Sequence, residues 1–370
     1  MNDATNKEYL PAERQDAILS LLTRQSVVKV PELAQLLHTT PITVRRDLAQ
    51  LAEAGLLRRV RGGAMSLNAC EQAEPPTEAS ANEPSAQQEA PDDDSIGLLF
   101  PEPSFLWPKV VDEIRMQARR HHLNVVPRET SYGTTSEVEQ LNDLAAIPGM
   151  RGLIIAPTPS EQLESASWNW IQESPLPIVV VERSHPSCAK GFFADSVNTN
   201  HPAGAWKAYW HFADNGHTRV AAAFSNSPTS SLISKGWQSA VESGSAIDCP
   251  FICTDVQPYN TKEVNAVVEK IIESHVSGIF VHSDYLAIAI AQSLTQHGLK
   301  VPDDVSMISV DGFASLSSRP LTVLKSSPQT LGRASLQLLL WRLSDPDGLT
   351  QHISFDPQLI DNGSVRNLNA

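Results

Sequence analysis

Side chains suited to binding DNA gather in one short part of the chain, between positions 40 and 61. An arginine guanidinium can donate two parallel hydrogen bonds to the edge of a guanine base. A threonine hydroxyl can bond a phosphate or contact the methyl group of thymine. These residue types predict contacts with double-stranded DNA. The candidates are Thr40, Thr43, Arg45, Arg46, Arg58, Arg59 and Arg61.

The charge of the chain is distributed very unevenly along its 370 residues. Residues 1–67 carry nine basic and seven acidic side chains, whereas residues 68–95 carry eight acidic side chains and no basic one. The net charge of the whole chain is −14. A small basic segment on an acidic protein is typical of a nucleic-acid binder whose remaining part does not touch the nucleic acid.

The spacing of apolar residues predicts three helices in the basic segment. The first spans roughly residues 12–24, and the second begins near Val30. Thr40 is expected to cap the third helix, with Pro41 at its first position. Val44 and Leu48 face inward on this third helix, which leaves its arginines on the outer surface. Two short strands, 56–60 and 64–67, are expected to follow around a Gly-Gly turn and to carry the remaining arginines on a wing.

The motifs of this segment resemble a known family. The runs TVRRDL at 43–48 and RVRGGA at 59–64, together with Gly55, resemble the DeoR-type winged helix-turn-helix over about 50 residues. Arg61 stands where that family often has histidine. The resemblance implies that the third helix and the wing bind operator DNA.

Residues 68–95 have the composition of a linker. They contain four prolines and no valine, isoleucine, leucine or aromatic residue, so they cannot bury enough apolar surface to fold. A flexible chain of this length spans roughly 30 Å on average. We therefore expect a DNA-binding domain at 1–67, an acidic, disordered linker at 68–95 and a separately folded domain at 96–370.

Apolar strands alternate with helical segments after the linker, a pattern that indicates βαβ units and parallel sheets. About 275 residues is large for one doubly wound sheet, so the sequence predicts an α/β domain of two lobes. The expected strands are 96–100, 123–126, 152–156, 178–182, 192–195, 220–224, 251–254, 278–282 and 307–310. The clearest expected helices are 107–121, 136–146, 201–214, 261–274 and 284–297.

This second domain resembles the effector domain of LacI/GalR-type repressors, which has the type I periplasmic-binding-protein fold. The most specific motif is GLKVPDDVSMISVDG at 298–312, followed by RPLT at 319–322. The resemblance implies a homodimer that binds a small effector between its lobes, either a sugar, a nucleoside or a related metabolite. It also implies that the ligand-binding residues are Phe105, Glu182, Arg183, Ser283 and Asp311.

One position departs from the family pattern. Ile233, three residues before Gly236-Trp237, stands where the family usually has an arginine that grips ligand hydroxyls or a carboxylate. Lys235 lies on another part of the helix and is a poor substitute. Three alternatives follow: a ligand with fewer hydroxyls, a different side chain that holds it, or a degenerate pocket.

The sequence contains none of the common enzyme motifs. GxGxxG, GxxxxGK[ST], GxSxG and HExxH are all absent, and Cys249 and Cys253 have no second pair at zinc spacing. We therefore expect no enzymatic activity, no cofactor and no metal.

The sequence also indicates where the protein acts. No apolar run is long enough to span a membrane, and the N-terminal residues do not form a secretory signal. The four cysteines are too scattered for a disulfide scaffold, so we expect a cytoplasmic protein.

Together these features predict a ligand-responsive transcription regulator, in particular a repressor of genes for carbohydrates or related metabolites. The alternative is a two-lobed α/β domain that binds or converts a small molecule, with the basic segment serving only as an interaction module. Catalytic pairs of residues between the lobes would favour the alternative.

Overall fold

The computed structural model divides the chain into two units, the head before position 92 and the body after it. The part of the chain that the structure describes comprises residues 18, 19, 22, 27–30, 33, 34, 39–53, 56–60 and 63–65 of the head. In the body it comprises 94–101, 106–130, 137–158, 166–183, 194–227, 229–258, 260–311 and 321–369. The linker boundaries at 68 and 95 therefore remain predictions.

The head contains a three-stranded antiparallel sheet in the order β1-β3-β2 and the helix α3 (Pro41–Glu53). Its strands are β1 (Val27–Lys29), β2 (Arg58–Val60) and β3 (Gly63–Met65). Gly63 is required by a close approach, since a Cβ atom there would lie only 1.9 Å from the Val28 carbonyl oxygen. The hairpin of β2 and β3 is the predicted wing, whereas β1 was not predicted.

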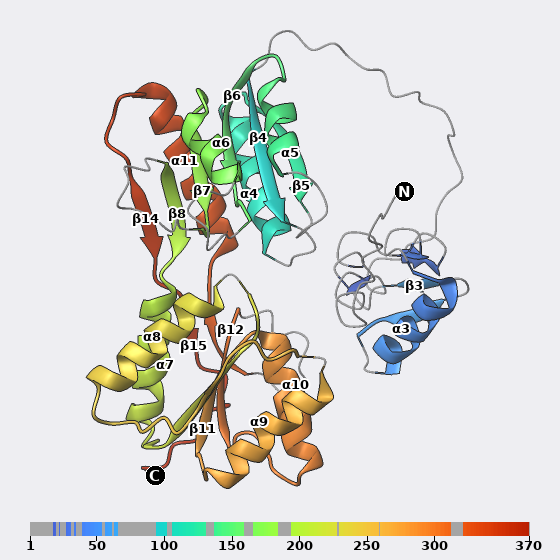
Figure 1. Ribbon diagram of the computed structural model, residues 1–370, viewed down its shortest axis with the longest axis vertical. Helices are drawn as coiled ribbons and strands as arrows, with labels where there is room; N and C mark the ends of the chain where they lie inside the picture. The colour runs from blue at the N-terminus through green and yellow to red at the C-terminus, as the bar shows by residue number, and fades with distance from the viewer. Residues whose placement is uncertain are drawn as a thin grey trace. The chain divides into compact units, whose positions relative to one another are not determined.

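The body folds into two lobes, each built on a six-stranded sheet (Figure 1). The sheet of the first lobe has the order β14-β8-β7-β6-β4-β5, and its strands run parallel. The strands are β4 (Ser95–Pro101), β5 (Asn124–Thr130), β6 (Met150–Ile155), β7 (Ile178–Val181), β8 (Asp195–Thr199) and β14 (His352–Phe355). The helices are α4 (Trp107–Arg120), α5 (Glu137–Ala145), α6 (Ala166–Glu173) and α11 (Pro328–Ser344).

The sheet of the second lobe has the order β10-β9-β11-β12-β13-β15, in which only β15 is antiparallel to its neighbour. The strands are β9 (Val220–Phe224), β10 (Ile252–Cys253), β11 (Gly278–His282), β12 (Ser306–Val310), β13 (Thr322–Lys325) and β15 (Gln358–Ile360). The helices are α7 (His201–Asp214), α8 (Ser230–Ser243), α9 (Thr261–Glu273) and α10 (Asp284–Gln296).

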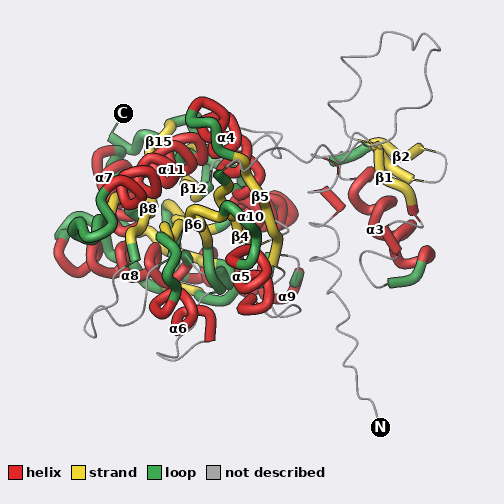
Figure 2. Tube along the Cα trace, turned by 90° about the horizontal axis from the view of Figure 1, so that it is seen from above, coloured by secondary structure: helices red, strands yellow, loops and turns green. Residues whose placement is uncertain are grey.

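Both sheets are covered by helices on both faces. Figure 2 shows the helices and strands of the body from above. Successive residues of a strand point to opposite faces, so Leu98 packs with α4 and α11, and Leu99 packs with α5 and α6. In the second lobe, Ile279 packs with α9 and α10, and Phe280 packs with α7 and α8. This two-sided burial explains why the strands are almost uninterrupted apolar runs.

The chain passes between the lobes three times. The crossings lie between β8 and α7, between β13 and α11, and between β14 and β15. The carboxyl ends of the parallel strands lead into these crossings and into the loops between the lobes. The fold class predicted from the sequence, an α/β protein with two lobes and a small winged helical domain, is confirmed.

Most strand and helix positions of the body match the expectations. The strands β9 and β11 and the helix α7 have the expected bounds. The strand β8 begins at Asp195 and thus lies later than the expected 192–195. Among the described residues, no helix combines the length and the apolar character needed to cross a bilayer.

Candidate functional site

The helix α3 starts at a well-formed cap. The Thr40 hydroxyl accepts a hydrogen bond from the Thr43 backbone N–H at 3.2 Å and lies 2.9 Å from the Thr43 hydroxyl. Such a cap satisfies one of the donors that a helix N-terminus leaves without an intrahelical partner. Val44 and Leu48 are fully buried against the rest of the head, so they fix which face of α3 points outward.

The outward face of α3 carries the predicted DNA-binding residues. Arg45 and Arg46 are exposed, whereas Asp47 between them and Leu48 is 2% exposed. Arg58 and Arg59 are exposed on the strand β2 of the wing. Arg61 lies outside the described residues. The head thus presents basic side chains on a capped helix and on the adjacent hairpin, as groove binding requires.

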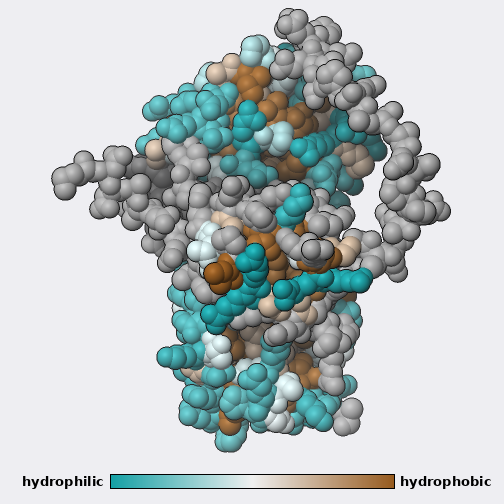
Figure 3. Space-filling model, turned by 90° about the vertical axis from the view of Figure 1, so that its right-hand side faces the viewer, coloured by the Kyte–Doolittle hydropathy of each residue, from teal (hydrophilic) through white to brown (hydrophobic). Residues whose placement is uncertain are grey.

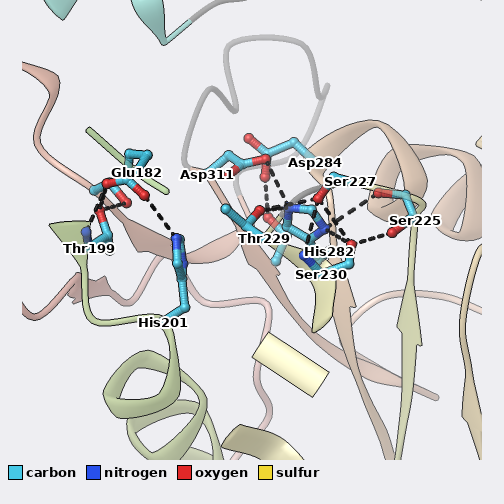
Figure 4. Close-up of polar contacts among 12 residues, drawn as sticks. Glu182, Thr199, His201, Ser225, Ser227, Thr229, Ser230, His282, Asp284 and Asp311 are labelled. Atoms are coloured by element: carbon cyan, nitrogen blue, oxygen red, sulfur yellow. Dashed lines mark hydrogen bonds and ion pairs between the residues drawn. The ribbon is translucent and has the colours of Figure 1, made fainter. Parts of the chain in front are cut away.

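In the body, the structure brings several polar side chains together where the strands of the two lobes end (Figure 4). We call this group the inter-lobe cluster. Its members are Glu182, Thr199, His201, Ser225, Ser227, Thr229, Ser230, His282, Ser283, Asp284 and Asp311. They lie at the carboxyl ends of β7, β8, β9, β11 and β12 or at the starts of α7, α8 and α10. Ligands of open α/β sheets bind at such carboxyl ends of strands.

Asp311 directly follows β12 and has a φ angle of +104°, which non-glycine residues rarely adopt. Its side chain is 34% exposed, and its Oδ2 atom lies 3.8 Å from Nε2 of His282. Burial raises the pKa of Asp311 to about 6; the charge of His201 opposes this shift and that of Glu182 adds to it. The carboxylate is therefore positioned to accept hydrogen bonds from a ligand.

His282 is surrounded by hydroxyl groups. Its Nδ1 atom lies 3.0 Å from Ser230 Oγ and 3.4 Å from Ser225 Oγ, and its Nε2 atom lies 3.5 Å from Thr229 Oγ1. Burial lowers the pKa of His282 to about 3, and the charge of His201 lowers it further. The imidazole is therefore neutral at pH 7 and can both donate and accept a hydrogen bond.

Ser283 is the N-cap of α10, and its side chain makes no capping hydrogen bond. It is half-buried and directly follows β11; its contact with a ligand stays a prediction. The next residue, Asp284, is 3% exposed and accepts a hydrogen bond from the Ser309 hydroxyl. Asp284 therefore belongs to the internal structure of the second lobe.

Glu182 and Arg183 lie at the end of β7, but their polar atoms contact the protein itself. The Glu182 carboxylate is bonded to Thr199 and His201. The Arg183 guanidinium donates to the carbonyl oxygens of Pro157 and Glu182, at 3.1 and 2.7 Å, and lies over the Trp107 ring. Both residues are 7% exposed, which limits their direct contact with a ligand.

Two further positions from the sequence analysis are Ile233, which is buried, and Phe105. Ile233 is 1% exposed and packs in the apolar core of the second lobe with Trp237, so it offers no polar atom to a ligand. Phe105 lies outside the described residues.

The described residues also line an open recess of about 500 Å³ at the lobe crossings, bordered by Thr199, Ser326 and Asp356, and no predicted ligand residue borders it.

The described residues contain no group of histidine, cysteine and carboxylate side chains that could hold a metal ion. Cys249 and Cys253 are free thiols. Cys249 accepts a hydrogen bond from Trp237 Nε1 at 3.3 Å, and burial raises the pKa of its thiol. A high thiol pKa disfavours the thiolate, so Cys249 has the character of a structural residue.

The sequence analysis missed His201 and His282, and it missed three serines of the cluster, Ser225, Ser227 and Ser230. His282 ends an expected strand, just as Glu182 does, so the strand-end rule could have found it. The run SNSPTSS at 225–231 follows another expected strand and carried the same signal. His201 begins a predicted helix, and only the fold brings it to Glu182.

Comparison with family models matches both parts of the chain. Residues 14–69 match the model of the DeoR-like helix-turn-helix domain. Residues 209–365 match the model of the periplasmic binding protein-like domain. The chain joins a DeoR-like helix-turn-helix domain to a periplasmic binding protein-like domain. The resemblance of each part to its family is thereby confirmed.

The similar curated proteins are transcriptional repressors. The HTH-type transcriptional repressor PurR of Photobacterium profundum is 28% identical over 209 residues, which are 54% of this chain and 60% of that protein. PurR of Vibrio campbellii is 26% identical over 203 residues, with the same coverage. The chain thus spans about 60% of the length of these relatives.

Solved structures share the fold of the body. A LacI family regulator from Enterococcus faecium with bound ribose has a TM-score of 0.59 at 20% identity and covers 74% of this chain and 100% of that one. The lac repressor dimer bound to operator and the anti-inducer ONPF has a TM-score of 0.63 at 20% identity, covering 77% and 100%. At this identity the likeness shows the two-lobed fold.

Proposed function

We propose that the protein is a ligand-responsive repressor of transcription. The head binds operator DNA, and the body binds a small metabolite and pairs with a second copy of the chain. The observation that carries this proposal is the joining of a capped helix with exposed Arg45 and Arg46 to a two-lobed fold shared with LacI-type regulators. Such a repressor acts in the cytoplasm, where its operator lies.

The DNA contacts divide between base reading and phosphate binding. Thr40, Thr43, Arg45 and Arg46 on α3 are suited to the major groove, and Arg58, Arg59 and Arg61 on the wing are suited to the flanking backbone. The proposed effector contacts are Asp311 and Ser283, together with Phe105, which lies outside the described residues. A sugar, a nucleoside or a related metabolite presents the hydroxyl or N–H groups that Asp311 requires.

The geometry of the inter-lobe cluster gives little support to the alternative that the body is an enzyme. His282 lies between Ser230, 3.0 Å from its Nδ1 atom, and Asp311, 3.8 Å from its Nε2 atom, an order that resembles a hydrolytic triad. However, an imidazole with a pKa of about 3 is a very weak general base, and the Ser230 hydroxyl donates to the Ser225 carbonyl oxygen. The similar curated proteins are repressors as well.

Selection from a library of random DNA duplexes tests the proposal. The full chain is expected to enrich one sequence motif, which it then binds in a gel-shift assay with much higher affinity than a scrambled duplex. The double variant Arg45→Ala/Arg46→Ala serves as the control and is expected to enrich no motif. A parent protein that enriches no motif, or a double variant that enriches the same one, would contradict the proposed DNA-binding function.

A further inference from the structure

We propose that Glu182 and His201 form a clasp that fixes the two lobes relative to each other at their hinge. Glu182 is then a positioning residue, which influences the effector response through the hinge and not by touching the ligand. The mechanical part of this proposal stands on the geometry alone, and the part that concerns the effector rests on the proposed function.

The contact joins the two lobes directly. Glu182 follows β7 in the first lobe, and His201 is the first residue of α7 in the second lobe. His201 Nε2 lies 3.1 Å from Glu182 Oε2, and the two side chains are 7% and 4% exposed. An N–H of the imidazole can donate to the carboxylate whether or not the ring is protonated. Because both side chains are buried, the pair is shielded from water and from salt.

The other oxygen of Glu182 is held on the side of the first lobe. The backbone N–H and the hydroxyl of Thr199 donate to Oε1 at 2.8 and 2.5 Å. These bonds oppose the effect of burial and, together with His201, hold the pKa of Glu182 below its usual value. Both carboxylate oxygens are thus engaged, one within the first lobe and one with the second lobe, and Glu182 has a strained φ of +54°.

The clasp is connected to all three crossings between the lobes. Thr199 and His201 bracket the first crossing. The Thr199 hydroxyl lies 3.2 Å from Ser326 Oγ in the second crossing, and the Asn200 amide donates to Asp356 in the third at 3.0 Å. The clasp therefore adjoins the segments on which any rotation of the lobes depends.

The clasp and Asp311 belong to the same inter-lobe cluster (Figure 4). The charge of His201 lowers the pKa of Asp311, and the charge of Glu182 raises it. We therefore expect a ligand bonded to Asp311 to change the electric field at the clasp.

A distance between two spin labels, one on each lobe, measures the clasp directly. Met116 on α4 and Ile272 on α9 are 45% and 40% exposed, so cysteines at these positions can carry labels after the four native cysteines are replaced by serine. Pulsed electron paramagnetic resonance on the full chain then gives the distribution of distances between the lobes. It requires neither DNA nor effector.

Two variants and one matched control complete the experiment. His201→Leu removes the partner from the second lobe, and Glu182→Gln removes the charge while it keeps the shape. Asp195→Asn breaks another buried ion pair, with Arg342 at 2.8 Å, that lies within the first lobe. We expect His201→Leu and Glu182→Gln to broaden the distribution or to shift its mean by more than the parent's width. Asp195→Asn should leave the distribution unchanged.

Unchanged distributions in folded His201→Leu and Glu182→Gln proteins would overturn the clasp. If His201→Leu fails to fold, Glu182→Gln decides alone. The outcome is distinguishable from failure of the proposed function. Altered distances in a protein that binds no specific duplex would refute the repressor and retain the clasp, whereas unaltered distances in a protein that binds its duplex would do the reverse.

Discussion

Two titratable side chains of the inter-lobe cluster have opposite effects on the stability of the fold. The pKa of His282 lies at about 3 in the folded state, below its value of 6.5 in an open chain. The unfolded chain therefore binds more protons between pH 3 and 6.5, so His282 makes stability rise with pH in this window. The pKa of Asp311 is raised to about 6, so its ionisation lowers stability as pH rises from about 4 to 6.

Replacement of His282 by glutamine isolates its contribution. In an Asp311→Asn background, the free energy of unfolding should rise with pH between 3 and 6.5 more steeply than after His282→Gln is added. The difference in slope should reach at most about 1.4 kcal/mol per pH unit, the value for one proton. Denaturant titrations at several pH values measure it. Parallel pH profiles of the two proteins would show that His282 is not held neutral by burial.

At the level of single residues, the sequence predicted the place of some side chains and missed that of others. The place of Asp311 and Ser283 could be predicted because they follow apolar strands, whose carboxyl ends converge on one edge. That they bind a ligand stays a prediction. Whether Glu182 is free or engaged could not be predicted, because its partners, Thr199 and His201, reach it only through the first crossing. A sequence shows that a carboxylate is present but not that both of its oxygens are already bonded.

Among the elements, α3 and the wing should contribute to DNA binding in different ways. Arg45→Ala or Arg46→Ala should cost about 1–3 kcal/mol on the preferred duplex and relax the sequence preference, because the helix contacts bases. Arg59→Ala on the wing should weaken binding to all duplexes and reduce the slope of log affinity against log salt by roughly one. Gel shifts at several salt concentrations separate the two effects. Full sequence preference in the α3 variants would contradict its role as the recognition helix.

The elements themselves were predicted best where burial is strongest. The strands β9 and β11 are buried along their whole length and appear as clear apolar runs in the sequence. The strands β14 and β15 are short and have exposed residues, so no such run marks them. β8 alternates between buried and half-buried residues, which explains why its bounds were placed too early. On the face drawn in Figure 3, apolar residues gather in a few groups among hydrophilic ones.

At the scale of the whole molecule, the linker should act through its reach. Its eight acidic side chains and four prolines in residues 68–95 are unsuited to entering a DNA groove, because phosphate repels them and proline interrupts helices. Replacement of residues 71–92 by a neutral Gly/Ser chain of equal length should preserve or strengthen binding to the selected duplex. A sharply shortened linker should weaken it, because the two heads of a dimer no longer reach both half-sites. Loss of specific binding with the neutral chain, measured by gel shift, would show that the linker makes specific contacts.

The central claim is that a metabolite bound by the body controls DNA binding by the head. The most direct test first identifies metabolites that raise the melting temperature of the full chain, and then measures its affinity for the selected duplex with and without them. In the parent protein we expect a change in duplex affinity of about 5-fold or more, as is typical of allosteric coupling. In Asp311→Asn, which should still bind the duplex, we expect no change. An equal response in Asp311→Asn, or a duplex affinity that no stabilising metabolite alters, would contradict it.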